Sequence, residues 1–79
     1  MKIIDLEDRM IVAENITSIK IEGRQVVIFI PDERQECCWF ASEQQAVACF
    51  DKMKHFLRSD LVDLFVITEQ PGFLRTCLQ

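Results

Sequence analysis

Residues 25–58 decide the fold, and they read QVVIFIPDERQECCWFASEQQAVACFDKMKHFLR. Two runs rich in β-branched, aromatic and cysteine residues, at 25–30 and 36–41, flank a turn at 31–34, and this pattern is typical of paired strands. Proline at position 31 fixes its own φ angle and has no amide to donate to a sheet, so it ends the first strand. The stretch therefore predicts two antiparallel strands.

An amphipathic helix is predicted over residues 42–58, directly after these strands. Ser42 and Gln45 have the Ser-x-x-Gln spacing of a capping box, which satisfies orphan N–H groups at a helix start. Basic residues gather in the last turns, as the helix dipole favours. The apolar residues fall within an arc of roughly 120° on a helical wheel; they are Ala46, Cys49, Phe50, Met53, Phe56 and Leu57. This stripe predicts that the helix packs on the sheet.

Further strands are predicted on both sides of this stretch. Ile19 and Ile21 alternate with polar residues, and Gly23 offers a tight turn into the run at 25–30. Two short apolar runs near the N-terminus, at 3–6 and 10–13, predict a hairpin that extends the same sheet. After the helix, residues 61–78 form an apolar segment whose β-branched part suits a strand. The pattern assigns no secondary structure to residues 69–79.

The sequence thus predicts one α+β domain over residues 1–79. It consists of an antiparallel sheet of about four to five strands, one amphipathic helix at about 42–58, and a C-terminal apolar segment. With 79 residues, 49% of them hydrophobic and 28% charged, the chain is expected to be ordered throughout. The core of so short a chain is thin, so a deep catalytic cleft is not expected.

Composition also limits the partners and the compartment. Acidic residues close to Met1 interrupt any signal-peptide core, and no apolar stretch approaches the roughly 20 residues that cross a bilayer. We therefore expect a cytoplasmic protein with reduced cysteines and no membrane partner. The net charge of -4 opposes binding to nucleic acid, and the acidic residues are too dispersed to imitate DNA.

The two central strands are apolar on both faces. In the run at 25–30, Val27 and Phe29 point away from their apolar neighbours, and Cys37 and Trp39 do the same in the next strand. One helix can cover only one face. The second face would expose an apolar patch of several hundred Å², and three covers are open: the tail at 61–78, a second copy, or a different protein or small apolar ligand. Val27, Phe29, Cys37 and Trp39 are therefore predicted interface residues.

No catalytic, cofactor or metal site is predicted. The four cysteines, Cys37, Cys38, Cys49 and Cys77, do not form Cys-x-x-Cys pairs, and metal sites built from thiolates commonly use such pairs. The single histidine, His55, falls off the apolar stripe of the helix, so no cysteine has an evident base beside it. No spacing forces two carboxylates together, and the two glycines are isolated, so neither acid–base nor nucleotide chemistry is indicated.

A resemblance supports the same architecture. The segment at 15–19, reading NITSI, then a hairpin, then FASE at 40–43 with Ala46 and Phe50, resembles many short bacterial proteins whose hairpin-rich sheet ends in one helix. This layout, over about residues 10–57, is similar to the C-terminal part of pleckstrin-homology-like domains. The chain departs from them because it is too short for a full domain of that type and because an apolar segment follows the helix. The resemblance implies binding of a protein or ligand more than catalysis.

These observations predict a non-enzymatic protein-interaction module that acts through its second apolar sheet face, as a homodimer or with another protein. The alternative is a binder of a small apolar ligand, held between sheet and helix or under the tail and lined by Phe29, Trp39 and Met53. An enzyme is the third possibility.

Overall fold

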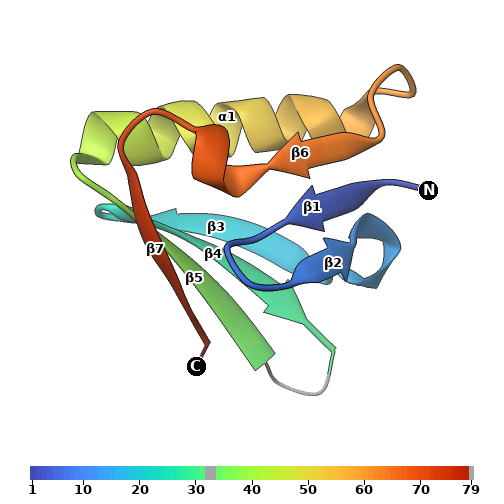
Figure 1. The fold of residues 1–79 in the computed structure, drawn as a ribbon, viewed down its shortest axis with the longest axis horizontal. Helices are drawn as coiled ribbons and strands as arrows, with labels where there is room; N and C mark the ends of the chain where they lie inside the picture. Colours follow the sequence, from blue (N-terminus) through green and yellow to red (C-terminus); the bar gives the residue numbers. More distant parts are fainter. Residues whose placement is uncertain (32–33, 79) are drawn as a thin grey trace.

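A computed structural model of the protein describes residues 1–31 and 34–78. The strands in this part of the chain are β1 (Ile3–Asp5), β2 (Met10–Val12), β3 (Ser18–Glu22), β4 (Gln25–Ile30), β5 (Arg34–Phe40), β6 (Leu64–Val66) and β7 (Phe73–Leu78). They are accompanied by the helix α1 (Glu43–Arg58) and by two short 3-10 turns, η1 (Ala13–Asn15) and η2 (Ile67–Glu69). The predicted α+β class, with an antiparallel sheet and one amphipathic helix, is confirmed (Figure 1).

The larger sheet has the strand order β3-β4-β5-β7 and is antiparallel throughout. The hairpin between β3 and β4 closes at Gly23, whose φ of 57° is in the left-handed region. The fourth strand comes from the C-terminal end that the sequence pattern did not assign. It pairs with β5 and carries a bulge opposite Trp39 and Phe40. The predicted turn between β4 and β5 includes Asp32 and Glu33, which lie outside the described residues.

A second, smaller sheet has the order β2-β1-β6. β1 and β2 form the predicted N-terminal hairpin, but the expectation that this hairpin extends the larger sheet was wrong. Instead, β6 returns after the helix and pairs with β1 in parallel, opposite Ile3, Ile4 and Asp5. The physical reason is the width of the larger sheet, because its inner face is more than one helix can cover.

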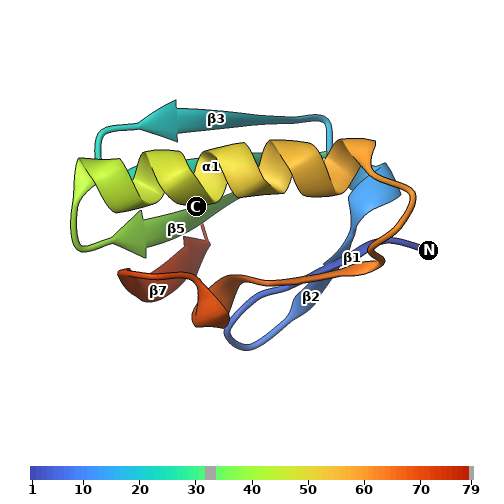
Figure 2. The same cartoon turned by 90° about the horizontal axis from the view of Figure 1, so that it is seen from above.

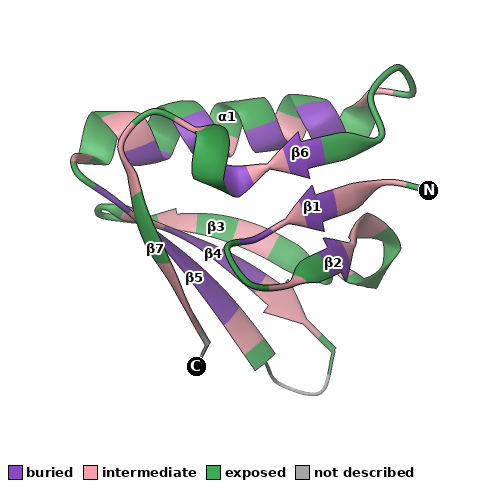
Figure 3. Ribbon diagram, viewed as in Figure 1, coloured by how far each residue is buried: buried purple, intermediate pink, exposed green. Residues whose placement is uncertain are grey.

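Helix α1 and the small sheet pack on the same face of the larger sheet, which we call the inner face (Figures 1 and 2). Val26, Ile28, Cys38 and Phe40 are fully buried on this face of β4 and β5, and Figure 3 shows buried stretches in both strands. The helix contributes Ala46, Cys49, Met53 and Phe56, and the segments around the small sheet contribute Ile4, Leu6, Ile11, Phe65 and Ile67. Most of the predicted helical stripe is therefore core.

The tail does not cover the second face of the larger sheet. Within residues 61–78, β6 joins the small sheet and β7 extends the edge of the larger one. Both placements satisfy backbone hydrogen bonds that a tail lying across a sheet face would leave unpaired. Of the three covers considered from the sequence, the chain's own tail is thus ruled out.

Side chains close both ends of the helix. The backbone amide of Gln45 donates to the Ser42 hydroxyl over 3.2 Å, which confirms Ser42 as the N-cap. At the other end, the ammonium of Lys2 donates to the carbonyls of Phe56 and Leu57, over 3.0 Å each. A cation at this end also suits the helix dipole. No helix in the described part of the chain is long and apolar enough to cross a membrane.

Gly72→Ala should destabilise the protein more than Gly23→Ala. Both glycines have positive φ, 80° and 57°, so each alanine incurs a left-handed strain of about 1–2 kcal/mol. A methyl group at position 72 would also overlap the side-chain amide of Gln45, whereas at position 23 the nearest atom is 4.0 Å away. Displacing the Gln45 side chain costs the hydrogen bond that its Oε1 accepts from the Ser42 hydroxyl over 3.2 Å, a further ~1 kcal/mol. Urea unfolding of both variants measures the difference, and equal losses would contradict the packing seen at Gly72.

Candidate functional site

The candidate site is the side of the larger sheet opposite the helix, which we call the outer face. Pairing opposes Val27 to Cys37 and Cys37 to Cys77, and it places Gln25 and Arg75 on either side of Trp39. By alternation along the strands, the outer face carries Ser18, Lys20, Glu22, Gln25, Val27, Phe29, Gln35, Cys37, Trp39, Arg75 and Cys77. All four predicted interface residues therefore share one face, and no described element lies across it (Figures 1 and 2).

The four predicted interface residues differ in accessibility. Val27 and Cys37, at the centre of the face, are each only 1% exposed, although no strand or helix covers them. Phe29 and Trp39 are half-buried. Val27 and Cys37 therefore cannot contact a partner directly. The apolar surface that a partner could contact comes from the rings of Phe29 and Trp39.

Two cationic side chains cover part of these rings. The Lys20 ammonium lies 5.2 Å from the ring centroid of Phe29, and the Arg75 guanidinium lies 5.6 Å from that of Trp39. Such cation–π contacts are weakly attractive at exposed sites, and the long aliphatic stems bury apolar surface while the charges stay in water. Lys20 also pairs with Glu22 at 3.2 Å. These cationic contacts were not predicted from the sequence, although the polar residues that alternate with Ile19 and Ile21 indicated the part on β3.

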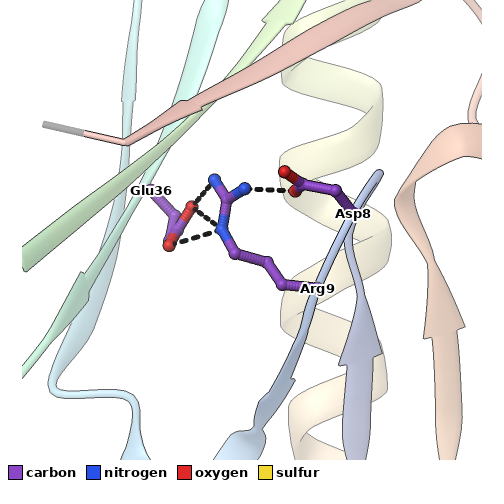
Figure 4. A network of polar contacts seen from close by, with 3 residues as sticks. All are labelled: Asp8, Arg9 and Glu36. Atoms are coloured by element: carbon purple, nitrogen blue, oxygen red, sulfur yellow. Dashed lines mark hydrogen bonds and ion pairs between the residues drawn. The ribbon is translucent and has the colours of Figure 1, made fainter.

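A buried ion pair lies on the inner face (Figure 4). Glu36 stands in the middle of β5, opposite Ile28, and its side chain is only 4% exposed. Arg9, at the turn between β1 and β2, donates from Nε to both carboxylate oxygens, over 2.9 and 2.8 Å, and from a terminal nitrogen to one of them. Its other terminal nitrogen pairs with Asp8. The hydrogen bond to Glu36 is the main cause that raises the pKa of Arg9.

The Arg9–Glu36 pair connects the two sheets and lines an open groove of about 470 Å³ between β2 and the ends of β4 and β5. Because all three guanidinium nitrogens of Arg9 already donate to carboxylates, the pair has a structural role. No sequence pattern predicted this pair. The available signal was Glu36 itself, which falls on the same face as the core residues Cys38 and Phe40.

The thiols are distributed between the two faces. Cys38 and Cys49 are buried in the core, and burial raises the pKa of Cys49 to about 12 and raises that of Cys38 as well. Burial also raises the pKa of Cys37 on the outer face. His55 is exposed on the helix. Within residues 1–31 and 34–78, no three His, Cys, Asp or Glu side chains cluster closely enough to hold a metal ion.

The three residues predicted to line a pocket for a small apolar ligand do not lie together. Met53 is fully buried between the helix and the inner face, whereas Phe29 and Trp39 lie on the outer face. The sheet itself separates them, so Phe29, Trp39 and Met53 cannot line one cavity.

Replacing Arg9 with methionine should lower the free energy of unfolding by about 2–3 kcal/mol, because the Glu36 carboxylate is then buried without its partner. This loss is smaller than that expected for a fully buried pair, because Arg9 is partly exposed. The double variant Arg9→Met/Glu36→Leu should recover part of this loss, since no charge is then buried. The exposed neighbour provides the control: Asp8→Ala should cost under about 1 kcal/mol. Urea unfolding measures all three, and a double variant less stable than Arg9→Met would contradict the assignment.

Stability should fall in alkaline solution as the core thiols ionise. The folded-state pKa of Cys49, about 12, lies above its ordinary value of 9.0, so the unfolded chain loses this proton first. The contribution is complete below about pH 9 and declines as the pH rises toward 12, by about 1.4 kcal/mol per pH unit for each such thiol. Urea unfolding between pH 8 and pH 11 should therefore show a shallower decline for Cys49→Ala than for the wild type. Identical slopes would contradict the prediction.

Comparison with known proteins adds no relative to this description. The chain matches no protein-family model, and no curated protein or solved structure is significantly similar to it. The resemblance to pleckstrin-homology-like domains therefore stays a prediction, and no function is transferred from a relative.

Proposed function

We propose that the protein is a non-enzymatic interaction module that self-associates through its outer face. The observation that carries the proposal is that no described element covers this face, although Phe29 and Trp39 stand on it with part of their rings exposed. Large aromatic side chains dominate the energetics of most protein interfaces because they bury much area with few rotatable bonds. Two sheets can pack face to face through such residues.

The charges on the outer face favour a second copy as the occupant. Among its described residues, this face carries two cations, Lys20 and Arg75, and one anion, Glu22. The whole chain has a net charge of -4, so the outer face is less acidic than the rest of the surface. Two copies that meet through this face therefore avoid most of their mutual repulsion, and each supplies both signs of charge for the other.

The thiol chemistry supports a role without catalysis. A nucleophilic cysteine acts as the thiolate, and burial raises the pKa of Cys37, Cys38 and Cys49, so only a small fraction of each is thiolate at neutral pH. His55 lies on α1, on the opposite side of the larger sheet from Cys37 and Cys77. We also place the protein in the cytoplasm, because free thiols at positions 37, 38, 49 and 77 suit a reducing compartment. Its acidic charge argues against nucleic acid as a partner.

Sedimentation equilibrium tests the proposal directly. The wild type should have twice the mass of one chain, and Trp39→Glu should have the mass of a single chain, because a carboxylate would be buried at the centre of the contact. Leu61→Glu is the matched control: Leu61 is 94% exposed after the helix, away from the outer face, so this variant should remain a dimer.

A second variant guards against loss of folding, since Trp39 is half-buried. Arg75→Glu changes an exposed side chain on the same face and should also weaken the dimer while the far-UV circular dichroism stays that of the wild type. A wild type with the mass of one chain would overturn self-association, and so would folded Trp39→Glu and Arg75→Glu variants that remain dimers.

A further inference from the structure

Two of the four cysteines face each other across neighbouring strands. Cys37 of β5 and Cys77 of β7 are direct partners in the antiparallel register, on the outer face. We propose that Cys37 and Cys77 form a reversible disulfide when the folded protein meets a small disulfide oxidant such as oxidised glutathione. The bond itself needs no second copy, because both thiols belong to one chain, but the oxidant reaches Cys77 on the outer face only in the monomer that is in equilibrium with the proposed dimer.

The backbone register brings the two Cα atoms within the range that a disulfide spans. The Ala41 amide donates to the Gly72 carbonyl, so the odd-numbered residues of β5 turn their backbone groups toward β7. Cys37 is then in a hydrogen-bonded pair, in which Cα atoms are about 5.5 Å apart. This value lies within the range of about 4.4–6.8 Å that disulfides span. The Cβ atoms of such a pair lie near the long end of about 4.5–5.5 Å, whereas a disulfide requires about 3.5–4.5 Å. The bond therefore requires β7, the edge strand of the sheet, to move by about 1 Å toward β5.

The other thiols are less suitable. Cys38 follows Cys37 directly but points into the core, and Cys49 of the helix is buried there as well. An oxidant in solution cannot reach either without opening of the core. Cys77, in contrast, is only half-buried and lies on an edge strand, so it is the thiol that an oxidant meets first.

The reaction proceeds in two balanced exchanges. The Cys77 thiolate attacks one sulfur of oxidised glutathione, forms a mixed disulfide and releases one glutathione thiolate. Cys37 then gives up its proton and attacks the Cys77 sulfur, which breaks the mixed disulfide and releases the second glutathione. The protein loses two hydrogen atoms, and one oxidised glutathione becomes two reduced molecules. The product ties the edge strand β7 covalently to β5, beside Trp39 and Arg75.

Mass spectrometry after incubation of the folded wild type with oxidised glutathione tests the proposal. The intact chain should lose the mass of two hydrogens and regain it with excess reduced glutathione. Trypsin separates residues 35–52, which contain Cys37, Cys38 and Cys49, from residues 76–79, which contain Cys77. These two peptides should appear joined, and fragmentation between the adjacent cysteines should place the bridge at Cys37.

Several results would overturn the inference. They are a bridge at Cys38, a bond inside the 35–52 peptide, a stable glutathione adduct without ring closure, and a link between two chains. Cys77→Ser is the matched variant, since a half-buried edge position tolerates it. It should keep its full mass under the same oxidant, and loss of two hydrogens by this variant would equally exclude the Cys37–Cys77 bond.

Discussion

A buried carboxylate constrains how the two sheets fit together. Glu36 stands on the inner face of the central strand β5, where a lone charge would be strongly unfavourable. Arg9, at the turn of the N-terminal hairpin, neutralises this charge and donates hydrogen bonds to both carboxylate oxygens. This requirement holds the small sheet against the larger one at a defined position, and the helix fills the remainder of the inner face. The apolar contacts of the core supply most of the burial, whereas the ion pair fixes their alignment.

The outer face combines buried residues at its centre with partly exposed aromatic rings beside them. Its central residues, Val27 and Cys37, are buried almost as fully as the core, yet no described element covers them. Around them, exposed cationic side chains lie over the aromatic rings, Lys20 over Phe29 and Arg75 over Trp39. Long cationic side chains are easily displaced, because their contacts are worth little in water. In the proposed dimer, displacement of these side chains would expose the two aromatic rings to the second copy.

The larger sheet thus serves as the wall of the core on one side and as the proposed interaction surface on the other. Both roles meet in β5, which carries Glu36, Cys38 and Phe40 toward the core and Cys37 and Trp39 outward. β7 completes the arrangement by bringing Arg75 and Cys77 to the outer face. The proposed interface and the proposed thiol pair therefore share one edge of the sheet.

The sequence by itself determined the local elements. Alternation and the Gly23 turn predicted β3, β4 and β5, and Ser42 with the apolar stripe predicted the helix, because these signals depend only on neighbours within a few residues. The two-faced apolar pattern also identified Val27, Phe29, Cys37 and Trp39 as one surface. Only the tertiary structure decided that the N-terminal hairpin pairs with β6, that the tail adds an edge strand, and that Arg9 reaches Glu36. These are contacts between residues far apart in the chain, and local periodicity contains no information about which distant strand or charge will be the partner.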